Sequence, residues 1–212
     1  MDDLITEIAL DGGLDSIRAL LDDAVEGSSR VVVIDATRAG EPSGRLTASE
    51  LRHLTLFELP VVFAFEGDIT TALADVALTS DIRVCSAAAS LIGPLAGNAR
   101  ARTLCDEARA LDLFIGRRAL PAAELLAAGL VSSVTENGYA LEEARRLAGV
   151  IASRGPIATR LAKEGIWRGL PQPIDQALRF ETDLTLLLQT TKDRAEGVRA
   201  FLEKRTPKFT GE

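Results

Sequence analysis

Hydrophobic positions follow a helical spacing near the start of the chain and then a strand-like run. Residues 14–26 repeat apolar side chains at the spacing of one helical face, and Gly27 is expected to end this helix in the left-handed conformation. The next segment, RVVVIDA (30–36), is continuously apolar, which is typical of a strand buried on both faces of a parallel sheet. The pattern therefore opens with a helix and a buried strand.

Two further buried strands alternate with helices. The sequence TASE, from Thr47 to Glu50, has the pattern of a capping box that opens a helix, and Pro60 ends that helix. PVVFAF (60–65) and DIRVCSA (81–87) are the predicted strands, with a short buried helix between them. Parallel strands need crossover connections, so this half of the chain predicts an α/β layered domain.

Helical patterns dominate after residue 98. Only LVSSV (130–134) has the pattern of a strand in this half, and there is no internal repeat or low-complexity tract. We therefore expect an α/β core over residues 1–137 and a helical region over residues 138–212. The segments with helical periodicity are 99–116, 121–129, 140–153, 156–169, 173–189 and 193–205.

Composition and charge narrow the possible classes of function. The chain has 212 residues, 47% hydrophobic and 26% charged, as in ordinary globular proteins. Its net charge of −7 argues against non-specific nucleic-acid binding and against an anionic membrane surface. No apolar run has the length of a membrane span, and the acidic start is unlike a signal peptide. We therefore expect a cytoplasmic protein that binds neither membranes nor nucleic acids.

Histidine and cysteine are too scarce to indicate a metal site. His53 is the single histidine, and Cys85 and Cys105 do not form a C-x-x-C pattern. This usage argues against a structural zinc site and against a disulfide framework. We interpret His53 as a structural residue and both cysteines as small buried hydrophobes.

One carboxylate stands alone inside the apolar stretch ITTALADVALT (69–79). If a helix begins near Thr70 or Thr71, Ala72 and Asp75 lie on one face of it. The first amides of a helix have no intrahelical partners and carry the positive end of the helix dipole. The Ala72 N–H can then bind an oxyanion while Asp75 transfers a proton beside it. Plain capping, with an acid favoured by the dipole, explains the same pattern, so both readings stay open.

The motifs around this stretch identify a resemblance. LPVVFAFEG followed by ALADVALTSDIRV resembles the crotonase (enoyl-CoA hydratase/isomerase) superfamily. GRRALPAAELLAAGLVSSV, PIATRLAKEGIWRG and TKDRAEGVRAFLEKRTPKFTG are similar to segments of the family's C-terminal half. The resemblance covers residues 14–211. It implies an α/β fold with a crotonase-like ββα spiral core and a helical C-terminal trimerisation region.

The resemblance also implies a site for an acyl-CoA thioester. Family members use two backbone N–H groups to polarise the thioester carbonyl and to stabilise the enolate. These amides correspond to Ala72 and to a loop position at Gly44 or Arg45, and Asp75 takes the place of the first catalytic glutamate. Phe201 and Lys204 match positions that contact the CoA adenine and phosphate of a neighbouring subunit. An amphipathic helix with a solvated face explains these two residues equally well.

Three departures from the family pattern keep the activity open. The segment SLIGPLAGN offers Gly93 and Pro94 but no counterpart of the second catalytic acid, the glycine run has become TTAL (70–73), and the first hairpin is nearly absent. Asp75 alone can move a proton between carbons, which is isomerase chemistry. The alternative is a catalytically degenerate subunit that binds thioesters or serves in an assembly.

The family further implies the partners of the protein. We expect a lyase or isomerase of the kind found in fatty acid metabolism, with no cofactor other than the coenzyme A carried by its substrate. The substrate would be an acyl-CoA or an acyl-carrier thioester, and the assembly a homotrimer or a hexamer. Basic side chains that either supplement phosphate binding or only solubilise a helix surface are Arg100, Arg102, Arg117 and Arg118.

Overall fold

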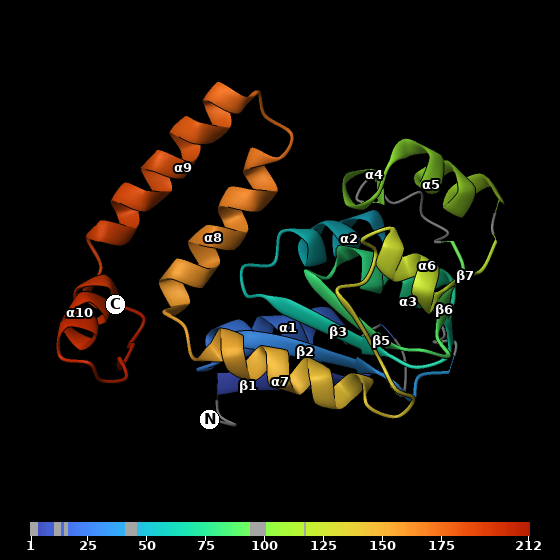
Figure 1. The fold of residues 1–212 in the computed structure, drawn as a ribbon, viewed down its shortest axis with the longest axis horizontal. Helices are drawn as coiled ribbons and strands as arrows, with labels where there is room; N and C mark the ends of the chain where they lie inside the picture. The colour runs from blue at the N-terminus through green and yellow to red at the C-terminus, as the bar shows by residue number, and fades with distance from the viewer. Residues whose placement is uncertain (1–3, 11–13, 15–16, 41–45, 94–100, 117) are drawn as a thin grey trace.

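The main element of the structure is a five-stranded parallel sheet. The computed structural model describes residues 4–10, 14, 17–40, 46–93, 101–116 and 118–212 (Figure 1). Neighbouring strands lie in the order β1-β2-β3-β5-β8, and every described pair is parallel. The strands are β1 (Ile5–Ala9), β2 (Val31–Ala36), β3 (Val61–Phe65), β5 (Ile82–Ser86) and β8 (Ser133–Thr135).

A second, smaller sheet lies beside the carboxyl ends of the central strands. In it β4 (Asp68–Ile69) pairs in parallel with β6 (Ser90–Leu91), which pairs antiparallel with β7 (Leu120–Pro121). We predicted none of these two-residue strands, and β7 corrects the expectation that 130–134 is the only strand of the second half. So short a strand carries no readable periodicity, which is why the sequence does not reveal it.

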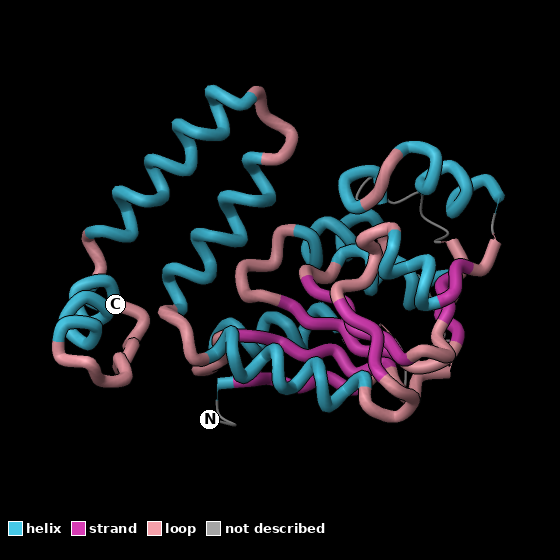
Figure 2. The backbone as a smooth tube through the Cα atoms, viewed as in Figure 1, coloured by secondary structure: helices cyan, strands magenta, loops and turns pink. Residues whose placement is uncertain are grey.

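Helices cover both faces of the parallel sheet (Figures 1 and 2). The face that carries Phe63 and Phe65 packs against α1 (Ile17–Glu26), α2 (Ala48–Thr55) and α3 (Thr71–Thr79). The opposite face carries small aliphatic side chains, and α7 (Ala140–Ala152) packs on it through a row of alanines spaced four residues apart. This two-sided cover explains why β2 and β3 are apolar at nearly every position.

The remaining helices lie at the two ends of the molecule. At one end are α4 (Ala101–Leu104), α5 (Glu107–Leu111), a π-helical turn, η2 (Asp112–Gly116), and α6 (Ala122–Ala127). At the other end α8 (Pro156–Gly169) and α9 (Ile174–Gln189) form a hairpin that leads to α10 (Lys192–Leu202) (Figure 1). None of the helices in the described part of the chain has the length and hydropathy that a membrane crossing requires.

The predicted α/β architecture is confirmed, with two local corrections. The predicted helix ends at Glu26, and the Gly27 N–H donates to the Asp23 carbonyl at 3.1 Å, but Gly27 is not among the glycines with positive φ. The chain therefore leaves this helix without the left-handed cap that we predicted. Residues 5–9, which we did not assign to a strand, form β1 in register with β2, from Ile5 beside Val31 to Ala9 beside Asp35.

A half-buried aspartate attaches the C-terminal hairpin to the sheet. Asp81 accepts hydrogen bonds from the Val61 N–H at 2.8 Å and from Trp167 Nε1 at 3.0 Å, and it lies 2.6 Å from Lys163 Nζ. Lys163 also donates to the Leu59 carbonyl at 2.7 Å. Two side chains of α8 thus converge on the point where β3 and β5 begin, and this contact sets the direction in which α8 leaves the core.

Candidate functional site

The first turn of α3 places a backbone amide in the protein interior. Thr70 is the N-cap residue, with extended φ and ψ of −130° and 169° and no side-chain capping bond. Its carbonyl accepts from the N–H groups of Leu73 and Ala74 at 3.2 and 3.4 Å. Among the described residues, none accepts a hydrogen bond from the Ala72 N–H. This amide therefore lies at the positive end of the helix dipole, in the position that can receive an oxyanion.

Asp75 lies one turn further along the same helix. The Ala72 and Asp75 side chains are three positions apart, so they share one face of α3, and the two residues are 3% and 4% exposed. All the neighbours of Asp75 within α3 whose burial is described are buried as well. A carboxylate in such surroundings loses most of its hydration, a cost that surface acids at helix starts do not bear. Its burial therefore separates Asp75 from an ordinary capping residue.

The second predicted amide, at Gly44 or Arg45, falls outside the described residues and stays a prediction. Leu46, which is buried, precedes a complete capping box that opens α2. Glu50 accepts from the Thr47 N–H at 2.6 Å while the Glu50 N–H donates to Thr47 Oγ1 at 3.2 Å. Since α2 packs against α3, the capping box fixes where this connection ends.

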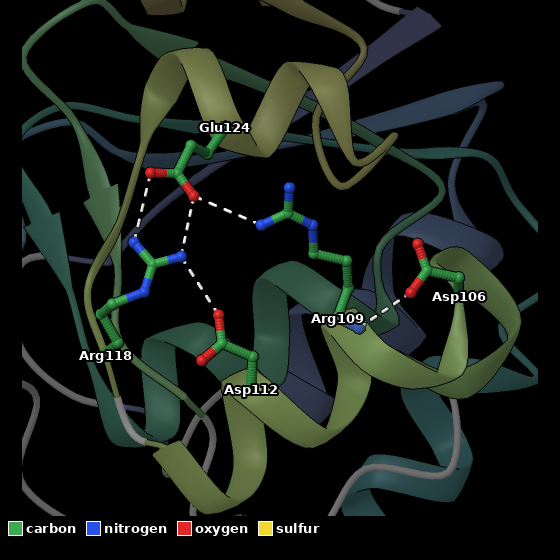
Figure 3. Close-up of polar contacts among 5 residues, drawn as sticks. All are labelled: Asp106, Arg109, Asp112, Arg118 and Glu124. Atoms are coloured by element: carbon green, nitrogen blue, oxygen red, sulfur yellow. Dashed lines mark hydrogen bonds and ion pairs between the residues drawn. The ribbon is translucent and has the colours of Figure 1, made fainter.

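An ion-pair network anchors the segment before α6 (Figure 3). The Glu124 carboxylate accepts from Arg118 Nη2 at 2.8 Å and from Arg109 Nη1 at 3.3 Å, and Arg118 Nη2 also donates to Asp112 at 3.1 Å. These bonds hold the pKa of Glu124 below its usual range and raise that of Arg118. Arg118 thus links η2 to α6. These bonds favour a structural role of Arg118 over a role in phosphate binding.

Helix α10, which carries Phe201 and is followed by Lys204, lies at the end of the molecule opposite to α3 (Figure 1). Phe201 is 82% exposed on α10. Lys204 follows the end of that helix with a φ of 54°, while its N–H donates to the Phe201 carbonyl and the Arg205 N–H donates to the Ala200 carbonyl. This is the Schellman geometry, in which glycine is the usual residue at the left-handed position. A single chain does not bring these two residues together with Ala72 and Asp75.

The contacts of the remaining candidates indicate structural roles; these residues are His53, Cys85 and Cys105. His53 Nε2 is 3.1 Å from Asp22 Oδ1, in a contact that links α2 to α1. Burial raises the pKa of the Cys85 thiol to about 12 and, together with Asp106, raises that of Cys105. In the described part of the chain, no three histidine, cysteine or acidic side chains gather as a metal site would require.

Two charged residues with long-range backbone contacts were not singled out by the sequence analysis. Glu66 follows β3 and accepts from the Gly138 and Ala140 N–H groups at 3.0 and 3.2 Å, so it caps α7 from a distant part of the chain. Arg83 of β5 is 4% exposed, and its guanidinium contacts the end of α3. The DIR segment of the family pattern contains Arg83, and this was the available signal.

Comparisons with known proteins agree with the motifs. The family model described as enoyl-CoA hydratase/isomerase matches residues 38–212. The short-chain-enoyl-CoA hydratase of Clostridium acetobutylicum is 29% identical over 211 residues, which covers 85% of this chain and 81% of that protein. The crotonyl-CoA hydratase of Syntrophomonas wolfei is 30% identical over 175 residues, covering 78% and 67% of the two chains.

A solved structure is similar over nearly the whole chain. The crystal structure of an enoyl-CoA hydratase from Bacillus anthracis matches with a TM-score of 0.83 and 29% identity, covering 99% of this chain and 96% of that one. This similarity confirms the predicted crotonase-like fold with its C-terminal helices, and the fold also contains the second small sheet that we did not predict.

The contacts of Glu196 predict an acid-sensitive attachment of the C-terminal tail. Arg205 Nη1 and Nη2 donate to Glu196 at 2.6 and 2.9 Å and the Lys208 N–H donates at 2.9 Å, which lowers the pKa of Glu196 to about 2. An unfolded glutamate titrates near ~4.3. The stabilisation is therefore complete above that pH and is lost as the pH falls from about 4 to about 2.

Urea unfolding of the natural protein and of Glu196→Gln between pH 2 and pH 6 measures this effect. We expect the natural protein to be the more stable above pH 5 and the difference to shrink as the pH approaches 2. A difference that stays constant over this range would contradict the assignment.

Proposed function

The chain belongs to the enoyl-CoA hydratase/isomerase family, whose model spans residues 38–212, and on this premise we propose that it is an enzyme acting on an acyl-CoA thioester. The proposed reaction proceeds through an enolate that backbone amides stabilise. The observation that carries the proposal is the Ala72 N–H, an amide at the first turn of a buried helix that donates to none of the described residues. A preorganised donor of this kind strengthens as negative charge develops on the thioester oxygen.

In this proposal the helix dipole and the Ala72 amide act together on the oxygen. Enolate formation moves charge from the carbon next to the thioester onto that oxygen, so a donor aimed there lowers the barrier more than it tightens substrate binding. A second donor from the loop at Gly44 or Arg45 would complete the oxyanion hole. Alanine in place of the family glycine keeps the backbone N–H. Its side chain is tolerated because a helix start needs no positive φ.

Asp75 is the proposed acid/base. It lies one turn beyond the amide on the same face of α3, so it would stand next to the carbon that gains or loses a proton. With one carboxylate available, the chemistry that fits best is the transfer of a proton between two carbons of an enoyl or acyl chain. Hydration would need a second group to activate water, and the relatives named as hydratases make that the first activity to assay.

Asp75→Asn tests the acid/base role. We expect kcat to fall by about 10²–10⁴-fold on crotonyl-CoA or a related enoyl-CoA, because the amide cannot accept the proton. The Kd for a non-reactive acyl-CoA, measured by calorimetry, should stay within a few-fold of the natural value, since the oxyanion donor is unchanged. An unchanged kcat would remove Asp75 from the mechanism.

A second candidate function is a thioester-binding subunit without turnover. The observation in its favour is the segment after β6, where the sequence GPLAGN contains no acid in place of the family's second glutamate. This candidate shares the proposed binding mode and differs only in chemistry. Assays with a broad panel of enoyl-CoA substrates separate the two, since robust hydration or isomerisation of any member rejects it.

Phe201 and Lys204 are proposed to contact the CoA nucleotide of a neighbouring subunit. Left-handed backbone costs a non-glycine residue about 1–2 kcal/mol, so a lysine at this position of the Schellman motif is retained at the expense of stability. A groove of about 630 Å³ between α10 and the C-terminal tail is lined by four cationic and three acidic side chains, and Glu196 pairs with Arg205 and Glu212 with Lys192. Those cations are Lys192, Arg199, Arg205 and Lys208.

Lys204→Gly should separate stability from binding. Glycine removes the backbone strain of the left-handed conformation at position 204. The free energy of unfolding should therefore rise by about 0.5–1 kcal/mol after the extra chain entropy of glycine is deducted. The affinity for CoA thioesters should fall, because the ammonium is lost. Lys204→Met is the matched control, expected to lose the affinity without the gain in stability. A stabilised glycine variant with natural affinity would contradict the proposed contact.

The proposed contact in trans requires an oligomer. The C-terminal helices expose large apolar side chains that a subunit interface would cover, among them Ile174, Leu178, Leu186, Leu187 and Phe201. We propose a homotrimer, or a hexamer of two trimers. Light scattering on the purified protein should give a mass three or six times the 22.6 kDa of one chain. A stable monomer would contradict the oligomer and the contact together.

A further inference from the structure

A buried arginine holds the far end of the helix that carries the proposed site. Arg83 belongs to β5, where it lies in register with Phe63 of the neighbouring β3. Its side chain donates from Nη1 to the Ser80 carbonyl at 2.5 Å and to the Ala77 carbonyl at 3.4 Å, both at the C-terminal end of α3. Its Nε donates to the Leu130 carbonyl. One side chain thus joins the sheet, the end of α3 and the loop that follows α6.

The charge of Arg83 is maintained although the residue is almost completely buried. Burial lowers the pKa of its guanidinium to about 10, partly offset by Asp81, so the group stays protonated at neutral pH. A buried cation is costly unless it is well bonded, and the three carbonyls are its compensation. Two of them belong to the negative end of the α3 dipole, where a cation is most favourable.

Several side chains donate hydrogen bonds to carbonyls in the second half of α3. Thr79 Oγ1 donates to the Asp75 and Val76 carbonyls at 3.0 and 2.9 Å, and Ser80 Oγ donates to the Val76 carbonyl at 2.9 Å. At the start, Thr70 supplies no side-chain capping bond. The hydroxyl bonds of Thr79 and Ser80 run to carbonyls of α3 itself, whereas the bonds from Arg83 tie this end of the helix to the sheet.

We propose that Arg83 is a positioning residue that sets the place of the Ala72 amide and of Asp75 by clamping α3 to the sheet. Nine residues of α-helix are about 13 Å long, so the guanidinium cannot reach a thioester bound at the first turn. It acts through the helix, which transmits a shift of its held end to the amide at its other end. Misplacement of a reacting group by about 1 Å can cost about 10²-fold in rate.

This inference rests on the proposed function, and infrared spectroscopy can test it without turnover. The carbonyl stretch of crotonyl-CoA labelled with ¹³C at the thioester carbon falls in frequency when hydrogen bonds polarise the carbonyl. We expect a lowered frequency on the natural protein and a frequency closer to that of free crotonyl-CoA on Arg83→Gln. If turnover is present, kcat should fall by about 10–10²-fold in this variant while KM changes by a few-fold.

Arg30→Gln is the matched control. Arg30 also donates to two backbone carbonyls, of Ala152 at 3.1 Å and Phe209 at 2.7 Å, but it contacts neither α3 nor β5 among its described bonds. It should lower stability without moving the carbonyl frequency or kcat. Arg83→Lys, which keeps the charge, should give an intermediate frequency. If Arg83→Gln does not fold, the carbonyl frequency and kcat of Arg83→Lys test the positioning role in its place.

The outcomes separate the two proposals. A folded Arg83→Gln with the natural frequency and natural kcat would overturn the positioning role and leave the oxyanion hole intact. Crotonyl-CoA bound to the natural protein with an unshifted frequency would overturn the oxyanion hole and, with it, this inference. An equal change in Arg30→Gln would show that general destabilisation, and not the clamp on α3, moves the carbonyl.

Discussion

The structure depends on helix α3, whose two ends differ in their hydrogen bonding. The carbonyls at the end of α3 are bonded by buried side chains, among them Thr79 and Arg83, while the amide of Ala72 at its start donates to none of the described residues. A helix held in this way can be buried against the sheet on small apolar side chains and still present an unused donor. The sheet supplies the rigidity, because Arg83 extends from one of its strands.

The same asymmetry explains why so apolar a stretch carries Asp75. Position 75 is enclosed by buried residues of α3, so burying a carboxylate there costs stability in proportion to the hydration that it loses. The first turn of α3 gives it a nearby positive potential from the helix dipole. In the proposed mechanism the interior of the domain would thus hold a hydrogen-bond donor and a proton acceptor on one face of α3, the arrangement that preorganised enolate chemistry requires.

The elements that could be predicted from the sequence are those with a long apolar run, a long helical periodicity or a capping motif. The buried strands β2 and β3, the capping box of α2 and the helices from α7 to α10 all have such patterns. By contrast, β1 is a five-residue strand at one edge of the sheet and is only partly buried, so neither a clean alternation nor an apolar run marks it. The two-residue strands of the small sheet follow from tertiary pairing and have no local signal.

The sequence predicts the part of the candidate site whose residues are close together in the chain. It does not predict the contacts between residues that are far apart in the chain. Ala72 and Asp75 are three positions apart, so a correct helix start was enough to place them together. The clamp by Arg83 joins β5, α3 and the residue Leu130, 47 positions away, which no periodicity reveals. Lys204 was identified by motif, yet its left-handed backbone could be recognised only in the structure.

The proposed mechanism requires the amide of Ala72 to bind the thioester oxygen. Amide NMR of the ¹⁵N-labelled protein, titrated with butyryl-CoA, tests it most directly. We expect the Ala72 amide proton to move strongly downfield at saturation, because it would form a new hydrogen bond to a polarised carbonyl. Saturable binding of butyryl-CoA that leaves the Ala72 resonance in place would contradict the proposed oxyanion hole.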